Sequence, residues 1–130
     1  PSTPLAPDEP LFVDDAAARL LAAWFALAWS VLVELGASVT LWPEHFDAAT
    51  TLGDEAAGQR GTFGASPGDD VDRDPYLYVT HWADVAEDEY WNEAHFPGAS
   101  LTVVTLADAS DQRASALTFL RRGRELLRGP

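Results

Sequence analysis

The hydrophobic pattern opens with a long apolar segment, in which residues 20–29 carry no charged side chain. Asp14 or Asp15 is a suitable N-cap, because an aspartate accepts hydrogen bonds from the first N–H groups of a helix. Gly36 is typical of the residue that follows a helix. The pattern therefore predicts a helix from about Ala16 to Leu35. Apolar residues occupy most of its circumference, so we expect it to be buried on most sides.

A membrane span is the alternative for this segment, since about 20 apolar residues cross a bilayer. Arg19 and Glu34 flank the segment, and its uninterrupted apolar part is short and rich in alanine. We therefore expect no membrane contact. Instead, the helix over residues 16–35 is expected to pack on a sheet. Its remaining surface is expected to contact either a missing N-terminal half of the protein or a second copy of the chain.

The middle of the chain alternates between apolar and polar residues or is rich in β-branched and aromatic ones, which predicts strands. The expected strands are Ser38–Trp42, Ala48–Leu52, Gln59–Ala65, Pro75–Trp82 and Ser100–Leu106. The sequence Ser66-Pro67-Gly68-Asp69-Asp70 favours a type II turn, with proline and glycine at its central positions. An acidic and aromatic loop is expected over Asp84–Gly98. Asp108 or Ser110 is expected to cap a second helix that runs to about Leu127.

The order of helix, hairpin-connected strands and helix predicts an α+β fold. We expect an antiparallel sheet of about four to five strands, with the N-terminal buried helix and the C-terminal helix packed on it. Residues 1–10 are rich in proline and predict an extended arm or linker, and residues 11–130 predict a single domain. The chain contains no methionine, even at its start. We therefore expect it to be a fragment of a longer protein.

Charge narrows the classes of partner. The chain has 21 acidic residues against 8 basic ones, all of them arginine, and a formal net charge of −13. Such a field repels phosphate, which disfavours nucleic acid and anionic membrane surfaces as partners. The absence of cysteine excludes disulfides, thiolate nucleophiles and cysteine-ligated metals. No secretory signal pattern is present in the sequence, and the predicted localisation is cytoplasmic.

One candidate metal site lies at the end of the first expected strand. His45 and Asp47 are two residues apart, so on a strand their side chains share a face and can converge on one divalent ion. His81 is a candidate third ligand. The alternative is a histidine that is hydrogen-bonded to a neighbouring carboxylate and orders a turn. A divalent metal is the one cofactor that the sequence suggests.

A candidate ligand site is formed by aromatic residues of the expected sheet together with two carboxylates. If the sheet leaves these aromatic side chains open, they form a cleft suited to a cationic or sugar-like ligand. The alternative is ordinary core packing. The candidate ligand-binding residues are Trp42, Glu44, Asp69, Tyr76, Tyr78 and Trp82.

Two other motifs do not support the chemistry that they suggest at first sight. Ser66 is followed by Pro67, which forces a turn and removes a backbone donor, so it does not form a nucleophile elbow. The acidic run over residues 70–74 begins like a calcium loop. Pro75 and His81 occupy the positions where such a loop has glycine and glutamate, so the EF-hand interpretation fails.

Several motifs together resemble a family of uncharacterised actinobacterial proteins. They are Trp42-Pro43-Glu44-His45-Phe46-Asp47, Gly64-Ala65-Ser66-Pro67-Gly68-Asp69, Pro75-Tyr76-Leu77-Tyr78-Val79 and Trp91-Asn92. From about residue 10 onward the chain resembles the C-terminal half of these proteins. The resemblance implies a longer parent protein but supplies no activity. It does not extend to His81, because Thr80-His81-Trp82 stands where the family has a sequence like Gly-Pro-Trp.

The sequence therefore favours a domain that binds a small molecule or another protein. A metal-dependent enzyme that uses His45 and Asp47 is the first alternative. A structural domain that docks through its apolar helix is the second. An aromatic cleft without convergent titratable groups would indicate the binding domain. A bound stoichiometric metal would indicate the enzyme, and an obligate dimer would indicate the structural domain.

Overall fold

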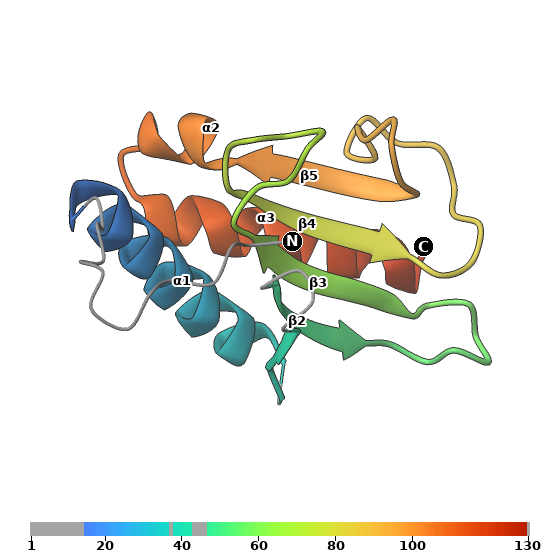
Figure 1. Cartoon of the computed structure of the whole chain (residues 1–130). Coiled ribbons are helices and arrows are strands. Elements are labelled where there is room, and N and C mark those ends of the chain that lie inside the picture. Colours follow the sequence, from blue (N-terminus) through green and yellow to red (C-terminus); the bar gives the residue numbers. More distant parts are fainter. Residues whose placement is uncertain (1–14, 37, 43–46, 130) are drawn as a thin grey trace, which may run out of the picture.

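The computed structural model describes residues 15–36, 38–42 and 47–129. It confirms the α+β fold, with an N-terminal helix, a five-stranded antiparallel sheet and a C-terminal helix (Figure 1). The elements are α1 (Asp15–Leu35), β1 (Thr40–Trp42), β2 (Asp47–Leu52), β3 (Gly61–Ser66), β4 (Tyr76–His81), β5 (Gly98–Thr102), α2 (Val103–Ala107) and α3 (Gln112–Arg128).

The sheet is a simple meander in which each strand pairs with its neighbours in sequence, in the order β1-β2-β3-β4-β5. One row across the sheet runs from Ala48 through Ala65 and Leu77 to Leu101. Because side chains alternate along a strand, this row and the rows two residues away face the same side. α1 packs against β2 and β3, and α3 packs against β3 and β4 on that side. The opposite side of the sheet carries Tyr76 and Tyr78.

The core lies between the sheet and the two long helices. Phe63 and Val79 are paired across β3 and β4, and both are fully buried beside Leu120 of α3. The other large, fully buried side chains are Val31, Leu32 and Leu77. Burial of each such side chain stabilises the fold by about 1.5–3 kcal/mol. The core therefore fixes the sheet against the helices and leaves the opposite side of the sheet free to carry polar groups.

The prediction that the first helix is buried on most sides is wrong. Its buried residues are Trp24, Ala28, Val31, Leu32 and Leu35, which form one face. Trp29 and Val33 on the outer side are 42% and 49% exposed. A wide apolar arc predicts burial, but the sheet and α3 together are only broad enough to cover one face of the helix. By length and hydropathy alone, α1 is also the one helix among the described residues that could cross a membrane.

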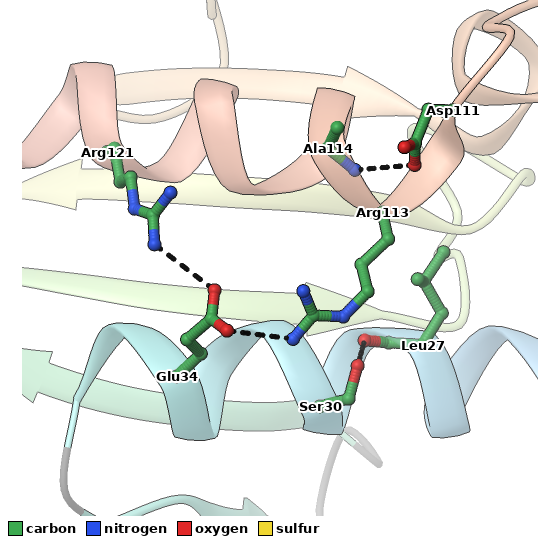
Figure 2. A network of polar contacts seen from close by, with 7 residues as sticks. All are labelled: Leu27, Ser30, Glu34, Asp111, Arg113, Ala114 and Arg121. Carbon is green, nitrogen blue, oxygen red and sulfur yellow. Dashed lines mark hydrogen bonds and ion pairs between the residues drawn. The ribbon is translucent and has the colours of Figure 1, made fainter.

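Polar contacts join the C-terminal end of α1 to α3. Arg124 of α3 donates to the carbonyl oxygen of Leu35 at 3.0 Å, which satisfies a backbone acceptor at the C-terminus of α1. Glu34 points from α1 toward α3, where it pairs with Arg113 at 3.2 Å and with Arg121 at 3.1 Å (Figure 2). These contacts hold α1 and α3 side by side under the sheet.

The predicted last strand is longer than the observed one. β5 ends at Thr102, whose side chain accepts a hydrogen bond from the backbone N–H of Thr105 and so begins the short helix α2. The cap of α3 is Asp111, which accepts from the N–H of Ala114, rather than Asp108 or Ser110. The expected arm over residues 1–10 lies outside the described residues.

Candidate functional site

The site lies on the side of the sheet opposite the helices, and β4 provides its floor. Tyr76 and Tyr78 are two residues apart on this strand, so both rings lie on that side, with their centroids 6.1 Å apart. Gly64 is directly opposite Tyr78 on β3. The missing side chain lets the Tyr78 ring extend over β3 toward β2, where its hydroxyl donates to Asp47 at 3.0 Å.

The turn between β3 and β4 forms one wall. Gly68 has a φ of 105°, in the left-handed region that favours glycine. The turn presents Asp69, which accepts hydrogen bonds from the N–H groups of Val71 and Asp72 at 2.9 and 2.8 Å. Its other oxygen accepts from the Tyr76 hydroxyl at 2.6 Å. Asp69 is therefore held in one orientation at the edge of the tyrosine pair.

These hydrogen bonds also set the charge states at the wall. The hydrogen bond from Tyr76, followed by that from the backbone of Asp72, lowers the pKa of Asp69 below its usual value. Burial and the bond to Asp69 raise the pKa of Tyr76, and burial and the charge of Asp47 raise the pKa of Tyr78. Asp69 is therefore a carboxylate and both tyrosines are neutral hydrogen-bond donors at physiological pH.

The long connection between β4 and β5 forms the other wall. Glu93 accepts hydrogen bonds from the N–H groups of Ala94 and His95, and its second oxygen accepts from the Ser100 hydroxyl at 2.9 Å. Asn92 exchanges hydrogen bonds with the backbone N–H and carbonyl of Ser100. This segment is therefore fastened to β5, and it places Glu93 opposite the turn that carries Asp69.

Phe96, three residues after Glu93, connects this wall to the floor of the site. Its ring meets that of Tyr78 edge-on, with the centroids 6.3 Å apart and an angle of 73° between the planes. Edge-to-face aromatic contacts of this kind are favourable. The two walls and the floor enclose a cleft of about 430 Å³, lined by Asp69, Val71, Asp72, Tyr76, Glu93, His95 and Phe96.

The lining of the cleft determines what it can bind. It has three carboxylates, one imidazole and two aromatic rings, and no arginine. Negative charge beside aromatic faces attracts organic cations and repels anions. Asp69 and Glu93 each already accept three hydrogen bonds from the protein, which pre-orients them and leaves each only about one further lone pair for a ligand.

The cleft contains part of the predicted ligand site. The structure brings Asp69, Tyr76 and Tyr78 together at one end of the sheet, and of these Asp69 and Tyr76 line the cleft. Trp82 lies just beyond the other end of β4, where its indole N–H donates to the Thr62 hydroxyl at 3.1 Å. Glu44 lies outside the described residues.

Trp42 is placed only by its backbone, which pairs with Asp47 across β1 and β2. The predicted aromatic set is thus divided along the sheet.

The candidate metal ligands are also separated. Asp47 begins β2 on the same side as the cleft, whereas His81 ends β4 on the side of Leu77 and Val79. The Nδ1 atom of His81 contacts the carbonyl oxygen of Ala83 at 2.8 Å. His45 lies outside the described residues. Within the described ranges, no three histidine, aspartate or glutamate side chains are grouped so that they could hold a metal.

Sequence reasoning missed Asp72, Glu93, His95 and Phe96 as parts of one site. The segment Asp84–Gly98 was expected to be an acidic and aromatic loop, which is a correct but general description. The hydrogen bonds of Asn92 and Glu93 with Ser100 and Gly98 show that the loop folds back along β5. The hydrophobic pattern does not predict such a contact, because the contact depends on how the loop is aligned with the strand.

No protein-family model, curated protein or solved structure matches the chain. The resemblance to the actinobacterial family therefore stays a prediction.

Proposed function

We propose that the chain is a small-molecule-binding domain whose ligand is an organic cation held in the cleft on the open side of the sheet. The observation that carries the proposal is the lining itself, which combines three carboxylates with the rings of Tyr76 and Phe96 and contains no arginine. The protein as a whole has a net charge of −13, so its field attracts a cation before contact is made.

The geometry supports binding in a defined orientation. A ligand ammonium between Asp69 and Glu93 would donate to the free lone pair of each carboxylate. An attached apolar group would then lie against Tyr76 and Phe96. Because both carboxylates are already fixed by hydrogen bonds from the backbone, little side-chain entropy is lost when the cation binds. A volume of about 430 Å³ suits a ligand of modest size.

Matched probes test the role of charge. Benzylammonium, benzyl alcohol and benzoate have similar shapes but carry positive, zero and negative charge. We expect isothermal titration calorimetry to show binding of benzylammonium, at least tenfold weaker binding of benzyl alcohol and no binding of benzoate. Chemical-shift changes should include the ring protons of Tyr76 and Phe96. Equal binding of the alcohol and the ammonium would contradict a cation site.

Substitutions locate the site. Glu93→Gln and Asp69→Asn keep the shape of each side chain and remove its charge. Each should weaken benzylammonium binding by about tenfold, corresponding to about 1.4 kcal/mol. Glu87→Gln is the matched control, because Glu87 is an exposed acid in the same loop that does not line the cleft. An equal loss in the control would show that only the overall charge of the protein matters.

Cytoplasmic localisation is part of the same proposal. The small α+β domain is compatible with it, and the cation-binding test does not depend on it.

A further inference from the structure

α1 carries a continuous outward stripe of residues with helical spacing. Successive members are three or four positions apart, so they lie on one side of the helix, opposite the face that covers the sheet. All are exposed. The outward stripe consists of Asp15, Ala18, Ala22, Ala26, Trp29 and Val33. Large side chains occupy its C-terminal end and alanines occupy its N-terminal half.

The stripe differs in charge from the protein around it. The chain carries a net charge of −13, yet between Leu20 and Leu35 the only charged residue is Glu34. Arg113 and Arg121 both pair with that carboxylate, as Figure 2 shows, and Arg124 donates to the Leu35 carbonyl, so arginines outnumber carboxylates at the C-terminal end of α1. Two copies of this acidic protein can therefore approach along α1 with little repulsion.

We propose that a second copy of this chain covers the outward stripe, with the two α1 helices antiparallel about a two-fold axis. This orientation places Trp29 of one protomer over Ala18 and Ala22 of the partner subunit, so that large side chains meet small ones at both ends. It also matches Ala22 with the partner's Ala26 near the axis, where the helices can approach most closely. A parallel pair would place Trp29 against Trp29 and leave the alanines without a filling partner.

Charge at the ends of the stripe favours the same orientation. Asp15 begins α1 and is the first member of the stripe. In the antiparallel pair it approaches the end of the partner helix at which Arg113 and Arg121 share one carboxylate. The helix dipoles are also opposed, which is the favourable arrangement. The hydroxyl of Ser30, beside the stripe, donates to the carbonyl of Leu27 at 2.9 Å and so does not require water when the surface is covered.

Sedimentation equilibrium of the full chain over a concentration series tests the association. We expect a dimer whose Kd rises at least tenfold in Trp29→Glu and in Val33→Glu, because each substitution introduces a charge that the partner would bury. Val104→Glu is the matched control, since Val104 is 57% exposed and belongs to α2, so it is not part of the stripe. It should leave Kd unchanged. A wild-type chain that stays monomeric throughout the series would overturn the proposal.

Cross-linking tests the orientation, because the chain has no cysteine of its own. In an equal mixture of Ala22→Cys and Ala26→Cys chains, oxidation should join unlike chains in preference to like ones. Ala18→Cys alone should not cross-link, since an antiparallel pair separates its two copies by roughly 18 Å along the helix axes. Efficient cross-linking of Ala18→Cys to itself would indicate a parallel pair and overturn the arrangement.

Vesicle flotation distinguishes a second copy from a lipid surface. The dimer should not float with phosphatidylcholine vesicles, because the stripe is already covered. Flotation of a wild-type monomer that Trp29→Glu abolishes would instead assign the stripe to a membrane. These tests do not use the cleft, so their outcome is independent of the cation-binding proposal.

Discussion

The ring of Tyr78 lies across Gly64 so closely that a Cβ atom at position 64 would approach the ring carbon Cζ to 2.4 Å. The glycine therefore sets the path of the tyrosine over β3 to Asp47. We predict that Gly64→Val displaces the ring, breaks its hydrogen bond to Asp47 and lowers the free energy of unfolding by about 1–3 kcal/mol. Chemical denaturation measures the change.

Measuring the same substitution in a second background isolates the contact between position 64 and the Tyr78 ring. In a Tyr78→Ala background the space above position 64 is empty, so Gly64→Val should be much less costly there than in the wild type. Equal costs in both backgrounds would show that the strand conformation, and not the tyrosine, requires glycine.

Asp69 should make the domain sensitive to acid. Its pKa is lowered in the folded state, so its contribution to stability is present above the unfolded value of about 3.9 and is lost as pH falls through the folded pKa. We expect Asp69→Asn to flatten the decline of stability below about pH 4, as followed by circular dichroism in urea. Because the side chain is largely exposed, the effect should be modest. The same slope in the variant and the wild type would contradict this role.

The three tyrosines of the chain should titrate together with alkaline unfolding. Burial raises the pKa of Tyr76, Tyr78 and Tyr90, and the Tyr90 hydroxyl donates to the carbonyl of Phe119 at 2.7 Å. Raised folded values mean that this stability is present below the unfolded pKa of about 10 and is lost as pH rises above it. Tyrosinate absorbance should therefore appear with the loss of near-ultraviolet dichroism. Titration of any tyrosine in the folded protein near pH 10 would contradict the prediction.

The polar contact between α1 and α3 should contribute less to the free energy of unfolding than the hydrophobic core does. Glu34→Gln removes two exposed ion pairs that share one carboxylate, and it should cost at most about 1 kcal/mol. Phe63→Ala opens a cavity at a fully buried position and should cost about 3–5 kcal/mol. Thermal and chemical denaturation of the two variants side by side tests the ranking. A larger loss in Glu34→Gln would mean that the helix pair, rather than the sheet, dominates the stability.

The local pattern predicted most of the architecture because it reflects backbone periodicity. In β4, for example, alternation along the strand puts Tyr76 and Tyr78 on one side of the sheet and the buried Leu77 and Val79 on the other. The pattern failed where contacts with other elements or side chains decide the structure. Whether the sides of α1 are covered depends on the width of the sheet beside them. Similarly, β5 ends at Thr102 because a side-chain cap competes with the strand there.

The candidate site was predictable only in part for a related reason. Asp69 and the tyrosines come from one hairpin, so short-range pairing brings them together. Glu93 and Phe96 reach them through a loop whose position is set by hydrogen bonds to Ser100. Trp82 belongs to the predicted set because it is an even number of residues from Tyr76 and Tyr78, so the alternation of the strand places all three on one side. Alternation along a strand determines which side of the sheet a residue faces, but Trp82 is six residues beyond Tyr76, which places the two residues roughly 20 Å apart.

The order of pairing in the sheet has a consequence for folding kinetics. Every strand pairs with its sequence neighbour, so the sheet can grow hairpin by hairpin, and each step closes only a short loop. Glu34 and its partner Arg121, in contrast, are 87 residues apart in the chain. Docking of α1 on α3 thus closes the longest loop and should come after the meander has formed. Substitutions at Glu34 should therefore change the unfolding rate and leave the folding rate nearly unchanged.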